Sequence, residues 1–154
     1  MTTNKPGTKT MHFNGVSSKK VKHLVRGRSL IFVAPDATVA EASALMREKN
    51  IGALAVMDGT ELLGIVSERD VVQRCVGLEN LDPRTYTVAR IMSYPPITID
   101  RNLSMSVAIV MMMEANIRHL PVMNGTRVLG MISIRQLVAE FRKGLEEGLM
   151  RLAA

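Results

Sequence analysis

The 154-residue sequence has no tryptophan, two tyrosines, three phenylalanines and a single cysteine. So few aromatic side chains argue against a nucleic-acid module that stacks bases on aromatic rings. Cys75 cannot form an internal disulfide, and cysteine and histidine do not occur at metal-ligand spacing. We therefore expect an intracellular, cytoplasmic protein without a bound metal. About one domain is expected from this length, with a core large enough to fold without such crosslinks.

Long hydrophobic runs and catalytic motifs are absent as well. The most apolar stretch, LSMSVAIVMMM at residues 103–113, is about half the length needed to cross a bilayer, so it predicts a buried helix and no membrane partner. The sequence has no Ser/His/Asp or Cys/His spacing typical of a nucleophilic enzyme. Gly64 and Gly130 do not belong to a glycine-rich phosphate loop. We therefore expect a protein that is not an enzyme.

Acidic residues are missing from the N-terminal part of the chain. Residues 1–28 hold seven Lys or Arg and no Asp or Glu, whereas residues 29–154 hold 13 basic and 14 acidic residues, a net charge of −1. The folded part is thus nearly neutral, and residues 1–20 are predicted to form a disordered basic arm. The arm has no apolar core like that of a secretory signal. Its composition leaves open an organelle transit peptide or an arm that binds nucleic acid.

The sequence contains an internal duplication. Residues 51–72, IGALAVMDGTELLGIVSERDVV, align without a gap with residues 117–138, IRHLPVMNGTRVLGMISIRQLV, and 11 of the 22 pairs are identical. The offset of 66 residues persists upstream, where it pairs Val33 with Ile99. Such self-similarity indicates a duplicated structural unit of about 45 residues.

Each unit changes its hydrophobic period in the same order. A short β-rich run (LIFV; PITI) precedes a helical stretch at 38–49 or 104–115, and two apolar runs then flank Asp-Gly or Asn-Gly, a strong hairpin signal. A second helix begins after a serine at an N-cap position. We therefore predict an α/β fold, strand-helix-hairpin-helix twice, packed as one pseudo-symmetric domain. The predicted divisions are a basic arm at 1–20, a first repeat with linker at 21–90, a second repeat at 91–143 and a helical tail at 144–154.

These two segments resemble the repeats of a cystathionine-beta-synthase (CBS) domain pair, and the resemblance covers about residues 20–143. The stretches GIVSERD and RHLPV carry it most specifically. With nothing recognisable fused to the pair, the chain is similar to stand-alone bacterial CBS-pair proteins. The resemblance implies an adenosine-containing ligand, with AMP as the first choice and NAD, ATP, ADP or S-adenosylmethionine as alternatives. It also implies a homodimer in which two pairs form a flat disk.

The resemblance places one ligand in a cleft between the repeats. Aliphatic side chains would hold the adenine, Asp70 the ribose, and the second repeat's basic side chains the phosphate. Asp70 is suited to this role because a carboxylate in the first turn of a helix can accept two hydrogen bonds from a ribose diol, beside N–H groups that favour an anion. The alternative is that Ser67 and Asp70 merely cap a helix. The resemblance completes the cleft of Ser67 and Asp70 with Ile97, Arg118, His119, Pro121 and Arg135. The full set of predicted ligand-binding residues also includes Arg69 and, in the opposite cleft, Ser133.

The opposite cleft departs from the family pattern. It would use Ser133 and Gln136 with Gly52 and Ala53, where the family usually has Asp at position 136. A neutral amide forfeits charge-assisted hydrogen bonds worth roughly 1.5–3 kcal/mol. No cation is expected at Gly52 or Ala53, so this cleft is predicted to have lost its ligand.

The sequence thus predicts a nucleotide-sensing module that forms a homodimer and reports adenylate or NAD status to a regulated protein that the sequence does not identify. A second hypothesis is a nucleic-acid-associated protein that binds through its basic arm and uses the pair only to dimerise. A third is a purely structural pair without ligands.

Overall fold

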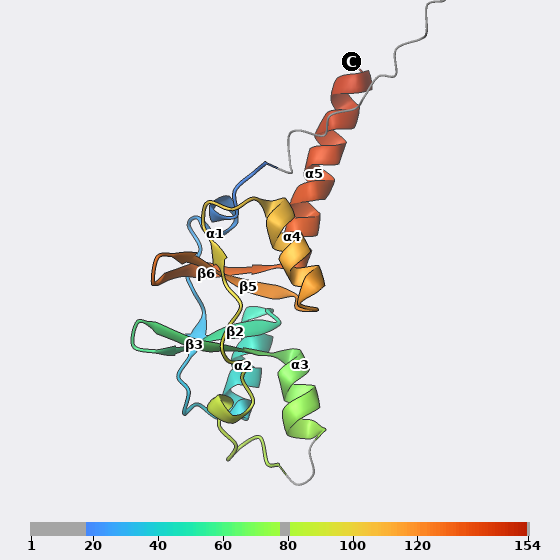
Figure 1. Ribbon diagram of the computed structural model, residues 1–154. Helices are drawn as coiled ribbons and strands as arrows, with labels where there is room; N and C mark the ends of the chain where they lie inside the picture. The colour runs from blue at the N-terminus through green and yellow to red at the C-terminus, as the bar shows by residue number, and fades with distance from the viewer. Residues whose placement is uncertain (1–17, 78–80, 154) are drawn as a thin grey trace, which may run out of the picture.

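The computed structural model describes residues 18–77 and 81–153 and confirms the duplicated α/β fold. Two three-stranded sheets, ordered β1-β2-β3 and β4-β5-β6, lie one above the other, and helices cover their outer faces (Figure 1). The first repeat contains β1 (Phe32–Val33), α2 (Val39–Lys49), β2 (Ala53–Asp58), β3 (Glu61–Ser67), α3 (Glu68–Asp70) and its continuation η1 (Val71–Val76). The second contains β4 (Ile99–Asp100), α4 (Met105–Glu114), β5 (His119–Asn124), β6 (Arg127–Ser133) and α5 (Ile134–Ala153).

Both hairpins form where the glycine dipeptides predict them. β2 pairs antiparallel with β3 and β5 with β6, while β1 and β4 add in parallel to β2 and β5. Gly59 and Gly125 occupy the turns with φ of 55° and 59°. This left-handed conformation is the one that a tight hairpin turn requires and that glycine adopts at little cost.

The helices of the two repeats are delimited by equivalent caps. Thr38 caps α2 through a reciprocal hydrogen bond with Glu41, and Ser104 caps α4 through the amide of Val107. Asn50 and Asn116 follow these helices in the left-handed conformation, with φ of 52° and 51°. Local side-chain chemistry therefore sets both ends of each helix.

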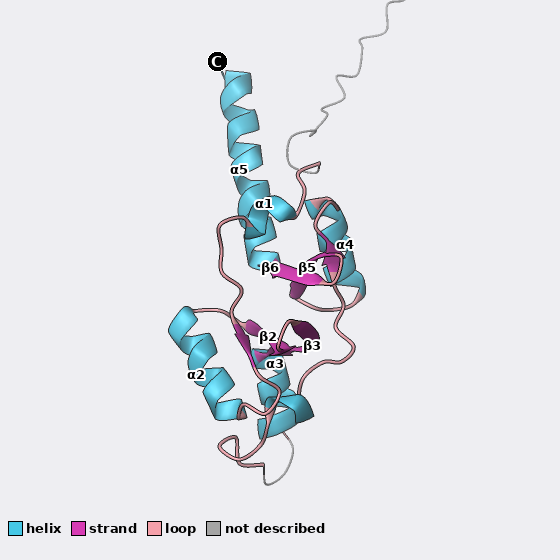
Figure 2. Ribbon diagram, turned by 90° about the vertical axis from the view of Figure 1, so that its left-hand side faces the viewer, coloured by secondary structure: helices cyan, strands magenta, loops and turns pink. Residues whose placement is uncertain are grey.

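The N-terminal segment packs on the second repeat, although it precedes the first. α1 (Lys22–Val25) contributes Leu24 and Val25 to the core around β5 and β6. The amide of Val21 donates to the carbonyl oxygen of Leu103 at 2.9 Å. At the pseudo-symmetric position, η2 (Val88–Arg90) packs on the core of the first repeat. Two loops then run between the repeats on opposite sides of the molecule, as Figure 2 shows.

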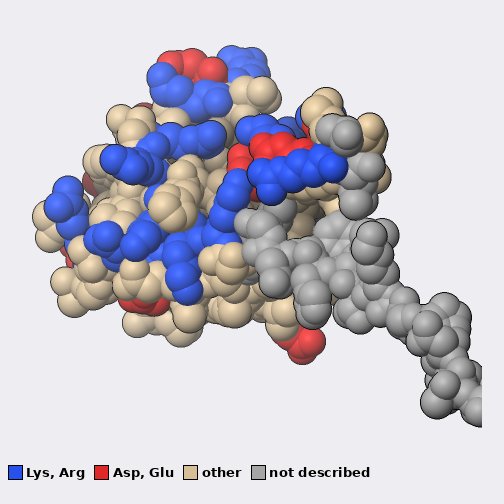
Figure 3. Space-filling model, turned by 90° about the horizontal axis from the view of Figure 1, so that it is seen from above, with Lys and Arg blue, Asp and Glu red and all other residues tan. Residues whose placement is uncertain are grey.

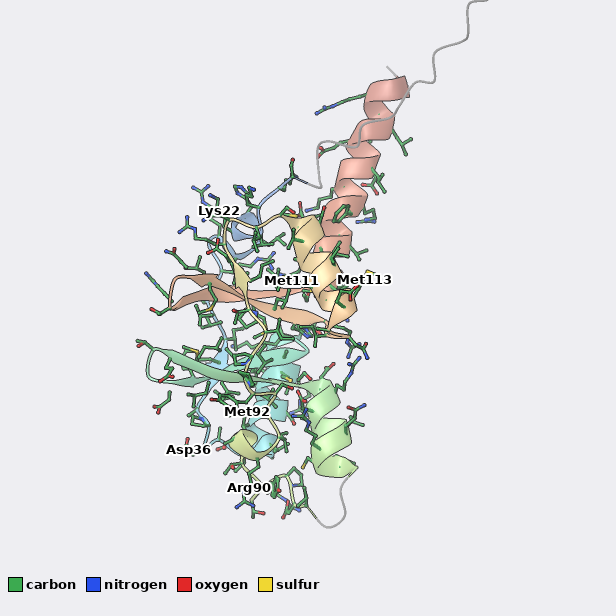
Figure 4. The ribbon with its side chains drawn as sticks, in the orientation of Figure 1. Lys22, Asp36, Arg90, Met92, Met111 and Met113 are labelled. Atoms are coloured by element: carbon green, nitrogen blue, oxygen red, sulfur yellow. The ribbon has the colours of Figure 1, made fainter. Side chains whose placement is uncertain are left out.

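Glycines on the second strand of each hairpin permit this close packing. A Cβ atom at Gly130 would lie 2.9 Å from the Cβ of Val25, and one at Gly64 would lie 2.8 Å from both the Met92 sulfur and the Ser93 carbonyl oxygen. Met92 lies against the first sheet beside η2 (Figure 4). The two glycines are 66 residues apart, so the same packing requirement occurs once in each repeat.

Replacing Gly64 tests this requirement. Gly64→Ala should lower the free energy of unfolding by about 1–3 kcal/mol, because the backbone oxygen of Ser93 cannot move away as a flexible side chain could. The matched control is Gly148→Ala in α5, where an added Cβ meets no atom within 4 Å and should stabilise the helix by up to about 1 kcal/mol. Urea unfolding followed by circular dichroism measures both; equal stability of the two variants would contradict the packing argument.

Candidate functional site

An open cleft of about 1010 Å³ lies between the repeats on the side of Gln136. The crossing segment 28–31 and the end of α2 form one wall, and the end of β6 with the start of α5 forms the other. Gly52 and Ala53 at the start of β2 lie in it, as expected.

Four of the nine predicted ligand-binding residues line the open cleft: Arg118, His119, Ser133 and Arg135. The resemblance assigned Arg118, His119 and Arg135 to the Asp70 cleft, and this assignment is wrong, because the start of β5 and the first turn of α5 face the cleft beside Gln136. The other five are not among its lining residues: Ser67, Arg69, Asp70, Ile97 and Pro121. Of these five, Pro121 is buried within β5 and Ile97 is 44% exposed.

The Asp70 carboxylate is buried and has partners on both oxygens. Its Oδ2 accepts hydrogen bonds from the amide of Ser67 at 2.9 Å and from the Ser67 hydroxyl at 2.7 Å. Its Oδ1 accepts one from the Ser93 hydroxyl at 3.4 Å and lies 3.6 Å from Nη1 of Arg74. Ser67 and Asp70 thus form a capping box. Binding of a ribose by Asp70 stays a prediction, and a ribose would have to share these oxygens.

Ser133 and Gln136 form the equivalent cap at the start of α5. The Gln136 Oε1 accepts from the Ser133 amide at 2.8 Å and from the Ser133 hydroxyl at 3.2 Å. The capping bonds therefore occupy the amide oxygen, and the remaining polar group of the side chain is the Nε2 donor. Where an aspartate would offer a second acceptor, this helix offers a donor.

The arginines that follow the two capping serines behave differently. Arg69 reaches across to the second repeat and donates from Nη1 to the carbonyl oxygen of Asn116 at 2.7 Å. The side chain of its equivalent, Arg135, forms no hydrogen bond or salt bridge with the described residues, although Asn50, the equivalent of Asn116, also lines the cleft. One arginine is therefore tied to the protein, whereas the other is available.

Four arginines line the open cleft: Arg28, Arg47, Arg118 and Arg135. Within residues 18–77 and 81–153, none of them has a salt bridge or side-chain hydrogen bond. Glu68 is the single acidic lining residue. The expectation that no cation serves this cleft is therefore wrong. It considered only the positions of Gly52 and Ala53, whereas the cations come from other elements.

His119 lies beside these cations in its neutral form. Burial lowers the pKa of His119 from 6.5 to about 4, with further contributions from the positive charges of Arg118 and Arg135. The absence of a side chain at Gly52 permits this arrangement, since a Cβ there would be 3.3 Å from the imidazole Cε1 and 3.2 Å from a Glu68 carboxylate oxygen. His119 can thus accept as well as donate a hydrogen bond at neutral pH.

Apolar residues of the crossing segment complete the cleft, and sequence reasoning missed them. Leu30 and Ile31 line it together with Met46 at the end of α2. The signal that could have found Ile31 is the 66-residue offset, which maps Ile31 onto Ile97, a residue predicted for the other cleft.

The comparisons with known proteins identify the family. The CBS domain model matches residues 21–77 and 88–143. The chain therefore belongs to the CBS domain family and carries two copies of the domain. Stand-alone members of this family are regulatory modules that are generally not catalysts.

Relatives and solved structures support the same assignment. The chain is 28% identical over 116 residues to a protein of Methanopyrus kandleri (74% of this chain, 59% of the relative). It is 30% identical over 105 residues to the CBS domain-containing protein YhcV of Bacillus subtilis (68% of this chain, 74% of the relative). The chain thus spans less than two thirds of the first relative's length.

Two solved structures share the fold closely. A protein with CBS domains from Burkholderia ambifaria superposes with a TM-score of 0.74 at 33% identity, covering 78% of this chain and 91% of that protein. The CBS domain protein PAE2072 of Pyrobaculum aerophilum, solved in complex with AMP, gives a TM-score of 0.68 at 25% identity, covering 77% and 89%.

Two other kinds of site were searched for in the described part of the chain. Residues 18–77 and 81–153 contain no group of three or more His, Cys, Asp or Glu side chains that could hold a metal ion. None of the helices described there has the length and apolarity to span a membrane.

The lowered pKa of His119 predicts a pH dependence of stability. The unfolded chain takes up a proton below about pH 6.5, whereas the folded protein does so only near pH 4, so the free energy of unfolding should fall as the pH falls through this window. From pH 7 to pH 5, His119→Gln should lose about 2 kcal/mol less than the parent protein. Urea unfolding at the two pH values measures this, and identical losses would show that His119 is not held neutral.

Proposed function

We propose that this protein is a regulatory module that binds an adenosine-containing ligand in the open cleft beside Gln136, without catalysis. The candidate ligands are AMP, ADP, ATP and NAD. One observation carries the proposal: a cleft between two CBS repeats is lined by four arginines, and none of them pairs with a carboxylate in the described part of the chain. The AMP complex of the structurally similar Pyrobaculum protein supports it.

The chemistry of the cleft suits the two ends of a nucleotide. Leu30, Ile31 and Met46 supply the apolar surfaces that hold a base, and backbone groups of the crossing segment can bond its edge. Arg118 and Arg135 supply charge-assisted hydrogen bonds for phosphate. Ligand binding would thus join groups from both repeats. A regulated protein would then respond to whether the ligand is bound between the repeats. We propose that this protein acts in the cytoplasm.

The other side of the molecule stays a candidate for a second copy of the same ligand. There Ser67, Asp70 and Ile97 would hold the nucleoside, as the family resemblance implies. This second site is secondary in our proposal, because Asp70 is already bonded on both oxygens and Arg69 is tied to Asn116.

Ligand binding can be measured by thermal unfolding with AMP, ADP, ATP and NAD. A ligand present at 100 times its dissociation constant should stabilise the protein by about 2.7 kcal/mol. Adenine alone should have little effect because it offers no phosphate. Arg135→Gln should remove most of the stabilisation, whereas Asp70→Ala should leave most of it. Arg127→Gln, at the exposed start of β6 and outside the lining of the cleft, is the matched control.

The opposite pattern would contradict this assignment. If Asp70→Ala abolishes the response and Arg135→Gln preserves it, the ligand occupies the Asp70 side. If none of the nucleotides changes the unfolding temperature, the adenosine-sensor hypothesis fails and a purely structural pair becomes the better interpretation.

We also propose that two chains form a homodimer. Apolar side chains that are 39–73% exposed lie on α4, α5 and η1, on one side of the two sheets (Figure 1). Met113 lies at the outer side of α4 (Figure 4). We call this surface the outer helix face; it comprises Val72, Val76, Val107, Val110, Met113 and Val138. Burial against a second copy would remove its apolar area from water.

Introducing negative charges on the outer helix face should dissociate the dimer. Light scattering of the parent protein should give twice 16.9 kDa. A variant carrying both Val110→Glu and Met113→Glu should give 16.9 kDa, because the interface cannot bury two added carboxylates. Thr126→Glu, in the exposed hairpin turn, should leave the mass unchanged. A parent protein that is monomeric at micromolar concentration would refute the dimer.

A second candidate function follows from the distribution of basic residues. Figure 3 shows Lys and Arg side chains spread over the face at the α1 end, with fewer acidic side chains. Lys19 and Lys20 of the basic arm and Arg26 of the following segment are exposed there, while residues 1–17 of the arm lie outside the described residues. Nucleic-acid binding through the arm would be weak and steeply salt-dependent and would disappear when residues 1–20 are removed. Tight binding that survives this deletion would assign it to another surface.

A further inference from the structure

The open cleft combines an excess of cations with a donor at the position where the family pattern has an acceptor. Its four arginines and one glutamate give a net charge of +3, because His119 is neutral. The Nε2 of Gln136 adds a further donor, since the capping serine holds the amide oxygen. A ribose diol needs acceptors for its hydroxyl protons, whereas phosphate oxygens need donors.

We infer that this cleft selects its ligand by phosphate charge, and that its preferred ligand is a nucleoside triphosphate or another polyphosphate rather than a monophosphate. The inference rests on the proposed function and specifies the ligand class of the same cleft. A monophosphate carries at most two negative charges and leaves part of the net positive charge uncompensated. A triphosphate carries up to four, which matches the four guanidinium groups.

The positions of the arginines favour a long anion over a compact one. Arg28 belongs to the crossing segment and Arg47 to the end of α2, whereas Arg118 begins the second hairpin and Arg135 lies in the first turn of α5. The four groups therefore come from four elements on two opposite walls. A chain of phosphates can contact both walls at once.

The equivalent positions on the Asp70 side do not carry this set of arginines, so the expected preference for polyphosphates applies only to the cleft beside Gln136. The 66-residue offset maps Arg28 onto Tyr94 and Arg47 onto Met113. Arg69, the equivalent of Arg135, donates to a backbone carbonyl. Duplication alone would have produced two similar clefts, so these substitutions concentrate the cations in the cleft beside Gln136.

Calorimetric titration with adenosine, AMP, ADP, ATP and inorganic tripolyphosphate tests the inference. Magnesium is omitted so that the phosphates keep their full charge. ATP should bind at least tenfold more tightly than AMP, adenosine should bind most weakly, and tripolyphosphate should compete with ATP. The advantage of ATP over AMP should shrink as the salt concentration rises.

Variants of the cleft arginines and of Gln136 test how each side chain contributes to the preference for ATP over AMP. Arg28→Gln and Arg47→Gln should each reduce ATP affinity more than AMP affinity, while Arg127→Gln should change neither. Gln136→Asp keeps an oxygen for the cap and restores an acceptor, so it should lower the ratio of ATP to AMP affinity by at least tenfold. A ratio unaffected by Gln136→Asp would contradict the donor role of Gln136.

The outcomes distinguish this inference from the proposed function. Equal affinities for AMP and ATP would overturn the selection by phosphate charge and leave the adenosine sensor standing. Binding of tripolyphosphate equal to that of ATP, without binding of AMP, would support the polyphosphate site and remove adenosine from the proposed function. No binding of any of these probes would overturn both.

Discussion

The packing of α1 against Gly130 is the constraint on which the rest of the molecule depends. The close approach of Val25 to this glycine fixes the N-terminal segment on the second repeat, whereas Phe32 pairs with Ala55 in the first sheet. The chain from 26 to 31 must therefore cross between the repeats. This crossing supplies one wall of the open cleft, so the same contact that joins the repeats also builds the site.

The duplication explains why the two sides of the molecule share a geometry and differ in chemistry. Both second helices begin with a serine that bonds the side chain three residues later. Capping requires only one acceptor oxygen, which Asp70 and Gln136 both provide. The second polar atom of that side chain is free to diverge without cost to the helix. A duplicated fold can therefore keep its architecture while one copy changes from an acceptor to a donor.

Local structure could be predicted from the sequence because it depends on neighbouring residues. The Asp-Gly and Asn-Gly turns, the capping serines and the 66-residue offset correctly predicted the hairpins, the helices and the duplicated fold. Of the cations in the open cleft, Arg118 and Arg135 were predicted as phosphate ligands but were assigned to the Asp70 cleft, and Arg28 and Arg47 were not predicted. Arg28 and Arg47 lie outside the aligned segments, and only the chain crossing brings them together. Likewise, nothing local indicated that Ser93, 23 residues away, bonds Asp70.

The positive charges of the open cleft suggest how an anionic ligand would be sensed. Guanidinium groups that have no carboxylate partner among the described residues repel one another. Burial lowers the pKa of His119, and the positive charges of Arg118 and Arg135 lower it further. An anion placed among them replaces repulsion between the two walls with attraction, since each wall contributes arginines. The free energy of the proposed binding would then act on the relative position of the repeats. Because the crossing segment belongs to one wall and is anchored to the opposite repeat at Val25, a shift of that wall also strains the contact at Gly130. A ligand bound in this cleft, as we propose, would thereby act on the contact between Val25 and Gly130.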